Sequence, residues 1–493
     1  MSLLHTDGYK FSMAEAGWPL RQETFYYAHR KGAAAVLPFD AEAEVRKLMP
    51  EPTEEDYRYL ASHEYEMGAG FKAAVLRRDR VIIRALPKGA WFLPREPAFS
   101  LSGPSALISW LEPQVLHLHY RIQIATLALT DPAALAAEVA TVTCDDQKNI
   151  VLATLDSVGV RAPVAITVDS DAYFQRVKAC AAQLASIVGD PARIFEVGLR
   201  AATCLSQHAI ALEACKAAGV RRTSHVAAAR ALDMIPVGTM GHEHVQRYGS
   251  DEAAFRAMRD RRPGRSSYLL DTFDTIRSGI PAAYRLMEEG YQSGDSIRYD
   301  SGDKEAQYRF AAKEARKRGI RSVQILEDGF DAALTEKFEV LRREVGWGPD
   351  EQFYGYGGYL IARTSGTSLV RDRVAAVYKL SQTATSPTMK FGDDDHAGKE
   401  SVPGNPVVFR RRSGDVRGGP RGVIGQVGEP PPAGYVQLTG EVAEVDGQGR
   451  GLGSTRPEGA RGAHDVALSP ETVAMATKLR QQREALVERQ AFA

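Results

Sequence analysis

Between about Leu135 and Lys379, short apolar runs alternate with longer segments of helical character. Examples of such pairs are PVAITVDS with AYFQRVKACAAQLASIV, and RIFEVGLR with AATCLSQHAIALEACKAAG. Repeated β/α units predict a parallel sheet, either closed into a barrel or doubly wound. In barrels of this kind the chemistry sits at the carboxyl ends of the strands. This alternation therefore limits both the fold and the place where functional residues are expected.

One strand–helix–strand unit, residues 296–331, carries acids at the ends of both of its strands. Asp300 and Asp303 follow the first strand, and Asp328 follows the second. Two carboxylates that converge at a sheet edge can hold sugar hydroxyls or a magnesium ion. They can also oppose positive charge that develops in a transition state. Alone, Asp303 would more often cap a helix and Asp328 would more often sit in a turn. Because the acids recur at successive strand ends, we favour the functional interpretation.

The other strand ends carry polar, charged or small residues as well. Such a set suits a phosphorylated sugar, because arginines bind phosphate and glycines let the backbone approach it. These residues are Arg200, Thr223, Ser224, His242, Asp271, Asp274, Asp300, Asp303, Asp328, Gly357 and Gly358.

Two further regions flank the barrel-like segment, residues 135–379. Residues 1–134 are expected to form an α+β domain, in which a capped helix bears Tyr9 and a strand delivers Arg30 into a glycine turn. Residues 380–493 are expected to pack back on that domain, with Gly/Arg-rich loops at 409–462 and a terminal helix. The predicted fold is thus an irregular (β/α) barrel of parallel strands plus an α+β domain.

Composition excludes several classes of protein. The 62 basic and 62 acidic residues balance, so binding to nucleic acid or to a membrane surface is not expected. No apolar run is long enough to span a bilayer, and the N-terminus has no apolar signal core. The four cysteines form no CxxC pair, which is typical of reduced thiols. We expect a cytoplasmic protein.

Several motifs, in order along the chain, carry a family resemblance. HTDGYKFSM resembles a TD-x-Y motif, YYAHRKG an arginine-bearing strand, VGLR an FG-x-R motif and RTSHV a GTSN-type segment. VGTMGHEH is similar to GT-x-A-H, and IRYDSGD closely matches R-x-DSGD. EDGFD, YGYGG, VYKL and GKESVPG fall where further segments are expected. Together they resemble the nicotinate phosphoribosyltransferase family, in the group that also holds nicotinamide phosphoribosyltransferase.

The resemblance implies a reaction in which phosphoribosyl pyrophosphate loses pyrophosphate and a pyridine nitrogen attacks C1 of the ribose. Asp300 and Asp328 would hold the ribose hydroxyls and favour the positive ring. The other implied contacts concern the phosphates and the pyridine. Arg298 would lie against the phosphoribosyl group, Gly329, Gly357 and Gly358 would admit the 5′-phosphate, and Arg30, Lys379 and Lys399 would neutralise pyrophosphate.

The resemblance also implies a phosphorylated histidine and a dimer. His242 would take the γ-phosphate of ATP, and hydrolysis of the phosphohistidine would drive the transfer; His244 competes for this role, but the GT-x-x-H spacing favours His242. Mg²⁺ and ATP are expected as cofactor and co-substrate, with no metal ligands assigned. Tyr9 and Arg30 would reach across a homodimer with shared active sites.

The choice of pyridine remains open between nicotinate and nicotinamide. Val197 replaces the family phenylalanine that stacks on the pyridine, and Phe195 lies on the same strand face. Ser224 replaces an aspartate of nicotinamide enzymes, which favours an acid substrate, and Asp303 is of the nicotinate type. Arg200 and Arg222 could balance the carboxylate of nicotinate. The YGYGG segment, in contrast, looks more like that of nicotinamide enzymes. A non-catalytic sensor or scaffold of the NAD pathway is the alternative of another class.

Overall fold

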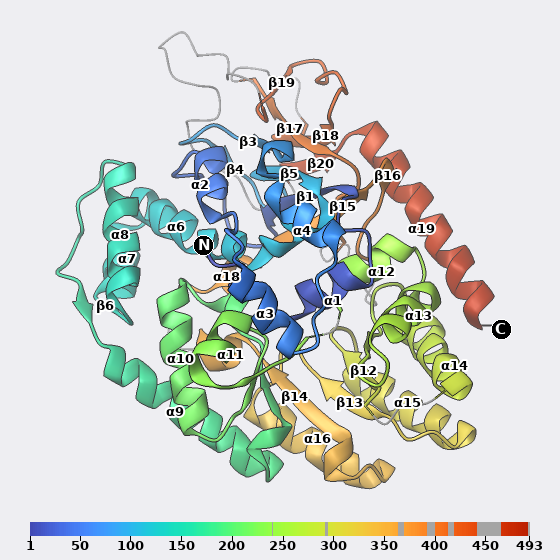
Figure 1. Cartoon of the computed structure of the whole chain (residues 1–493). Coiled ribbons are helices and arrows are strands. Elements are labelled where there is room, and N and C mark those ends of the chain that lie inside the picture. The colour runs from blue at the N-terminus through green and yellow to red at the C-terminus, as the bar shows by residue number, and fades with distance from the viewer. Residues whose placement is uncertain are drawn as a thin grey trace.

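A curled sheet of seven parallel strands organises the larger part of the protein (Figure 1). The computed structural model describes residues 1–238, 240–290, 294–362, 369–391, 400–412, 419–440 and 465–491. The strand order of the sheet is β10-β9-β8-β14-β13-β12-β11. β14, the last of these strands in sequence, lies beside β8, the first, and the sheet is open between β10 and β11. The predicted irregular barrel is confirmed. Its strands are β8 (Ile194–Glu196), β9 (Arg222–Thr223), β10 (Ile235–Pro236), β11 (Ser267–Leu269), β12 (Ser296–Tyr299), β13 (Val323–Leu326) and β14 (Gln352–Tyr356).

Helices cover the outer face of this sheet, as Figure 1 shows. Many begin at an aspartate whose side chain caps the first turn and end at a glycine of positive φ, such as Gly189, Gly319 and Gly346. Buried tyrosines on β11, β12 and β14 pack beneath them. The helices are α9 (Ser170–Val188), α10 (Leu205–Ala217), α11 (Val226–Leu232), α13 (Asp251–Arg261), α14 (Ile280–Gly290), α15 (Lys304–Arg318) and α16 (Ala332–Val345). Short turns connect them: η2 (Pro191–Arg193), η3 (Leu199–Ala201), η4 (Thr275–Gly279) and η5 (Pro349–Glu351).

A second part, built on an antiparallel sheet, combines segments far apart in sequence. Strand order in this sheet is β16-β15-β1-β5-β3, where β1 (Gln22–His29) pairs with β15 (Ala376–Thr383). The expected boundary at 379 therefore falls inside β15. Other strands here are β2 (Ala35–Val36), β3 (Ile82–Ala85), β4 (Trp91–Phe92), β5 (Phe99–Pro104) and β16 (Ser386–Pro387). The helices are α1 (Tyr9–Glu15), α2 (Ala41–Leu48), α3 (Glu54–Ser62), α4 (Ala69–Leu76), η1 (Arg78–Arg80), α5 (Ser105–Trp110) and α6 (Glu112–Thr130).

C-terminal strands pack on this second part, whereas the C-terminal helix packs along η4 and α14 of the barrel (Figure 1). The strands form a four-stranded sheet, and the helix is the long α19 (Pro470–Ala491). Much of the Gly/Arg-rich stretch, 413–418 and 441–464, lies outside the described residues. The strands are β17 (Pro406–Arg411), β18 (Gly422–Gln426), β19 (Tyr435–Gln437) and β20 (Val466–Leu468). Remaining elements are α7 (Pro132–Val139), β6 (Thr141–Val142), α8 (Asp145–Ser157), β7 (Thr167–Val168), α12 (His242–Tyr248), α17 (Gly358–Ile361) and α18 (Arg371–Val374).

The N-terminal segment docks at the open edge of the parallel sheet. The backbone N–H of Gly8 donates to the carbonyl of Ser224 at 2.7 Å, and Asp7 forms an antiparallel bridge with His225. Gly238 has φ of 144°, and a Cβ there would lie 2.3 Å from the backbone nitrogen of Tyr9. Glycine at 238 thus lets α1 approach the barrel, which brings Tyr9 to its opening.

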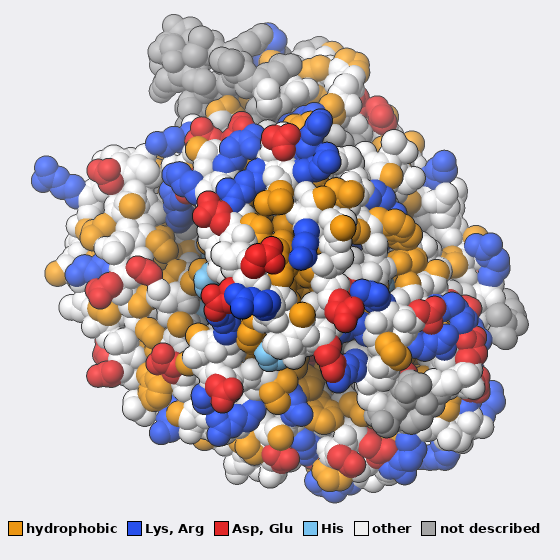
Figure 2. Space-filling model, viewed as in Figure 1, with side chains coloured by type: hydrophobic (Ala, Val, Ile, Leu, Met, Phe, Trp, Pro, Cys, Tyr) orange, Lys and Arg blue, Asp and Glu red, His pale blue; other side chains and the backbone are white. Residues whose placement is uncertain are grey.

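The described surface agrees with the balanced charge. On the face shown in Figure 2, basic and acidic side chains are interspersed. Among the helices that the structure describes, none combines the length and apolar character needed to cross a bilayer. All four cysteines lie in described segments and none forms a disulfide there, and the sulfur atoms of Cys144 and Cys204 are 3.6 Å apart.

Candidate active site

Two adjoining cavities open at the carboxyl ends of the parallel strands. The larger one, about 520 Å³, extends into the barrel and is lined by both parts of the molecule. The smaller one, about 470 Å³, lies at the ends of β13 and β14. Val197, Arg200, Asp300 and Glu327 line both cavities. These four residues therefore mark the seam where a ligand could occupy both spaces.

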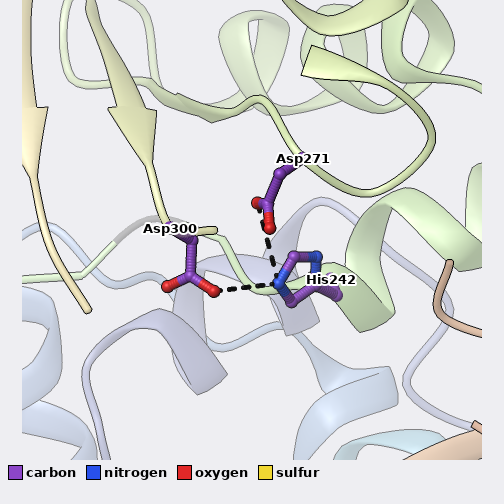
Figure 3. Close-up of side chains that lie close together, drawn as sticks. All are labelled: His242, Asp271 and Asp300. Carbon is purple, nitrogen blue, oxygen red and sulfur yellow. Dashed lines mark hydrogen bonds and ion pairs between the residues drawn. The ribbon is translucent and has the colours of Figure 1, made fainter. Parts of the chain in front are cut away.

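His242 is the first residue of α12 and faces two aspartates (Figure 3). Its Nε2 lies 3.2 Å from Asp300 Oδ2 and 3.8 Å from Asp271 Oδ1. Its Nδ1 lies 3.0 Å from the hydroxyl of Thr272. If the ring is neutral and Nδ1–H donates to Thr272, Nε2 carries the lone pair. The ring thus presents Nε2 at the larger cavity, which His242 lines.

Lys390 completes this cluster from the C-terminal segment. Its Nζ is 2.7 Å from Nε2 of His242 and lies 3.6 Å from Asp271 and 3.8 Å from Asp300. Burial and the charge of Lys390 lower the pKa of His242, although both aspartates oppose that shift. Burial alone would raise the pKa of Asp300, but His242, Lys390 and Arg298 together hold it well below its usual value. Asp300 is thus an ionised carboxylate at the seam.

Acidic side chains also crowd the end of β13. Glu327 lies 3.7 Å from the guanidinium of Arg298, which projects from β12. Asp328 follows in the left-handed region, with φ of 52°, and its side chain is exposed at the smaller cavity. Desolvation and the negative charge of Asp300 raise the pKa of Asp328. Asp300 and Asp328 both line the smaller cavity, so the structure places the two carboxylates at one rim.

Glycines line the smaller cavity, as a phosphate cradle requires. Gly329, Gly357 and Gly358 all border it, together with Arg371. A Cβ on Gly358 would come 3.0 Å from a carboxylate oxygen of Asp372. Side chains at these positions would restrict the approach of a ligand to the backbone, and glycine leaves that approach open.

Tyr9 lines the larger cavity beside Arg200. Tyr9 donates its hydroxyl proton to Glu112 at 2.7 Å, and the Arg200 guanidinium lies 5.5 Å from the tyrosine ring centre. Arg200 also pairs with Asp7 at 3.5 Å and with Glu112 at 3.4 Å. Ser224 donates to Asp7 at 2.6 Å. Tyr9 thus reaches this cavity within its own chain, and the homodimer stays a prediction.

Aromatic rings lie deeper in the barrel. Phe195 lines the larger cavity and stacks on Phe353 with ring centres 5.4 Å apart. The Arg222 guanidinium lies 5.7 Å from the Phe195 ring and donates to the carbonyl of Ala192. Val197 borders both cavities. Phe195 is accordingly placed where it can contact a planar ligand, whereas Arg222 is occupied by the rings and the backbone.

Lys379 extends from β15 into the larger cavity. Burial and the charges of Lys390, Arg30 and Arg200 lower the pKa of Lys379 to about 7, despite the opposing charge of Glu112. Arg30 follows β1 and is half-buried, and its pKa is lowered mainly by burial. Arg30 is not one of the described residues that line the two cavities.

Other candidates occupy structural positions. Asp303 is exposed and caps α15 by accepting from the backbone N–H of Ala306 at 3.1 Å. Thr223 is fully buried and donates to Glu196 at 2.7 Å. His244 is buried, with Nε2 2.9 Å from the carbonyl of Ala254. Lys399 lies outside the described residues. The structure therefore places most of the candidates at the two cavities, but Asp303, Thr223 and His244 are not among the residues that line them.

Four residues near the site were given no individual role from the sequence: Asp271, Thr272, Lys390 and Glu112. Asp271 stood among the strand-end acids, which was the available signal. Thr272 follows it directly, and Lys390 belongs to the C-terminal segment expected only to pack on the second part. Glu112 begins α6, far from any strand end. No local pattern marks Lys390 or Glu112, because long-range packing brings them to the site.

Comparison with known proteins finds sequence relatives that are named nicotinate phosphoribosyltransferase. The nicotinate phosphoribosyltransferase of Bacillus subtilis is 28% identical over 244 residues, which cover 47% of this chain and 45% of that protein. That of Bos taurus is 26% identical over 356 residues, which cover 68% of this chain and 61% of that protein. The chain thus spans between 45% and 61% of the length of these two relatives. No family model matches the chain.

Solved structures share the fold. The nicotinate phosphoribosyltransferase of Porphyromonas gingivalis superposes with a TM-score of 0.57 at 17% identity, over 81% of this chain and 95% of that one. The Vibrio cholerae protein of the same name superposes with a TM-score of 0.57 at 18% identity, over 81% of this chain and 90% of that one. The chain is thus similar in sequence to nicotinate phosphoribosyltransferases over part of its length and shares the fold of solved structures of that name.

Proposed function

We propose that this protein transfers the phosphoribosyl group of phosphoribosyl pyrophosphate to nicotinate, forming nicotinate mononucleotide and pyrophosphate in NAD salvage. The observation that carries this proposal is the position of Asp300. This carboxylate lies at the seam between a cavity with aromatic rings and Arg200 and a cavity lined by glycines. A ribose at the seam would direct its C1 toward the first cavity and its 5′-phosphate toward the second.

At that seam the chain can stabilise the transition state. As the C1–O bond to pyrophosphate breaks and the ring nitrogen approaches C1, positive charge develops on the ribose. Asp300 is ionised and faces this charge, while Asp328 lies at the same rim. Lys379 and Arg30 would neutralise the departing pyrophosphate. Proton transfer is not required, because the attacking pyridine nitrogen carries a lone pair.

ATP would act through His242. The Nε2 lone pair would attack the γ-phosphorus, so that an N–P bond forms while the bond to the ADP oxygen breaks. Asp271 and Asp300 lie within 3.8 Å of this nitrogen. Lys390 would neutralise charge on the phosphoryl group. Hydrolysis of the phosphohistidine would then favour the forward transfer.

Magnesium suits the same cluster. One ligand atom each from His242, Asp271 and Asp300 lies within 4.8 Å of the others, and Asp271 Oδ1 is buried without a hydrogen-bond partner among the described residues. Asp271 and Asp300 would hold the ion, since Mg²⁺ prefers oxygen ligands. Magnesium would supply positive charge for the phosphates.

A second candidate substrate, nicotinamide, is favoured by one observation. Asp7 lies beside Ser224 and Arg200, so a carboxyl group is present at the place where Ser224 lacks one. Burial raises the pKa of Asp7, with Arg200 and Ser224 opposing the shift. A carboxyl group here could accept from the amide of nicotinamide.

The decisive assay measures mononucleotide formation from phosphoribosyl pyrophosphate with nicotinate or nicotinamide, each with and without ATP. We expect faster turnover of nicotinate, stimulated by ATP. Asp300→Asn should lower this turnover by about 10²–10³-fold, as expected for loss of transition-state charge stabilisation. Asp274→Asn is the matched control, because Asp274 follows β11 but caps η4. Full activity of Asp300→Asn would contradict the proposal.

A further inference from the structure

Three histidines form a continuous chain beside the two cavities. Nδ1 of His5 lies 3.2 Å from Nε2 of His225, and Nδ1 of His225 lies 3.0 Å from Nδ1 of His208. Nε2 of His208 then lies 3.1 Å from Glu196 Oε1. His225, His208 and Glu196 are at most 3% exposed, and His5 is half-buried. The transfer chemistry proposed above uses none of these side chains.

The direction of these hydrogen bonds follows from the carboxylate at one end. Glu196 also accepts from the hydroxyl of Thr223 and from the backbone N–H of Gly198. Nε2 of His208 must therefore carry a proton to donate to Glu196. With neutral rings, Nδ1 of His208 accepts from Nδ1–H of His225, and Nε2 of His225 accepts from Nδ1–H of His5. Burial lowers the pKa of His5 and of His225, which keeps both rings neutral.

Glu196 joins the two loops that reach the larger cavity. Its bond to Gly198 leads directly into η3, which carries Arg200. Its bond to Thr223 fixes the start of the other loop, and Thr223 in turn accepts from the backbone N–H of His225. Ser224 lies between these two residues and lines the cavity. The spacing of Arg200 and Ser224 therefore depends on a carboxylate that His208 helps to hold.

We propose that His208 and His225 are positioning residues that set the geometry of Arg200 and Ser224 for a pyridine bearing a carboxylate. This inference rests on the proposed function. If a link of the chain is removed, a buried donor or acceptor loses its partner, which is costly in a dry interior. The loops that end at Glu196 would then relax, and oriented binding of the pyridine would weaken.

The first test is the tautomer of each ring, measured by ¹⁵N NMR correlation of the labelled full-length protein. We expect the proton on Nδ1 in His5 and His225 and on Nε2 in His208. Single substitutions would assign the signals. A neutral His225 that carries its proton on Nε2 would overturn the proposal, because the chain could not run toward Glu196.

The second test is nicotinate binding, measured by calorimetry, in His225→Leu and His208→Leu. Each should weaken binding by about tenfold, since a lost buried partner typically costs this much. His225→Asn, which keeps one donor and one acceptor, should recover part of the affinity. The matched control is His119→Leu, because His119 is fully buried and contacts Gln123 at 2.8 Å. Thermal unfolding of every variant separates a loss of binding from a loss of folding.

These outcomes separate the two proposals. Unchanged nicotinate affinity in folded His225→Leu, or an equal loss in His119→Leu, would overturn the positioning role. Wild-type protein that fails to bind nicotinate would overturn it as well. Wild-type protein that binds nicotinate and shows the expected tautomers but forms no mononucleotide would contradict only the proposed function.

Discussion

At the scale of single residues, two histidines on one helix have opposite surroundings. His242 begins α12 and meets Asp300, Asp271 and Lys390 at the cavity. His244 faces the core, stacks near Tyr248 and has its pKa lowered to about 4, mainly by burial. On a helix, positions i and i+2 point to different sides. The GT-x-x-H spacing favoured His242 over His244, and of the two residues only His242 lines the cavity.

Substitution of each histidine tests this distinction. His242→Ala should abolish the acid-labile label that γ-phosphate-labelled ATP leaves on the protein, because it removes the nitrogen that would carry the phosphoryl group. His244→Ala should retain the label and lower the free energy of unfolding, since it removes a buried ring. Autoradiography after acid and base treatment, combined with thermal unfolding, measures both effects. Label that persists in His242→Ala would show that another residue is phosphorylated.

At the scale of elements, the ends of strands and the starts of helices compete for the same aspartates. Asp300 ends β12 and faces the cavity, whereas Asp303, three residues later, caps α15. The sequence pattern does not separate these roles, because both positions follow a strand. The two residues differ in the direction that the backbone gives their side chains.

For Asp303, the capping arrangement predicts an effect on stability. Asp303→Ala should lower the free energy of unfolding by about 1 kcal/mol, since an N-cap side chain is lost. Turnover per folded molecule should stay close to that of the wild type. Urea unfolding and steady-state kinetics on the same sample measure the two quantities. A large loss of turnover at unchanged stability would support the substrate-binding role that the resemblance implies.

At the scale of the whole molecule, buried ion pairs join the two parts across the site. Lys10 on α1 lies 2.7 Å from Glu112 on α6 and 2.7 Å from Glu243 on α12. Arg247 extends the network from Glu243 to Glu23 on β1. These side chains are almost fully buried. Both parts of the protein are thus linked by charges that are largely buried.

Lys10→Met tests this coupling. The variant leaves Glu112 and Glu243 buried without their cation, which should cost about 3–5 kcal/mol of unfolding free energy. Lys47→Met is the matched control, because Lys47 pairs with Glu44 on the surface and is 69% exposed. Denaturant unfolding of both variants provides the comparison. Equal stability of the two would mean that the network contributes little.

Local patterns account for much of what could be predicted. The alternation of apolar and helical runs indicated the parallel strands, and the acids after β12 and β13 indicated the rim. Each of these signals lies within a few residues of the feature that it marks. The pairing of β1 with β15 spans more than the whole barrel, and no short pattern contains it.

By itself, the sequence determined the β/α order, the strand-end acids and the motif set that points to a phosphoribosyltransferase. Tertiary structure decided which of these side chains meet. It brought Lys390 to His242, Tyr9 and Asp7 to Arg200, and three histidines to Glu196. It also left Asp303 as a helix cap. The physical reason is that secondary structure follows from near neighbours along the chain, whereas a site depends on the closure of loops between distant segments.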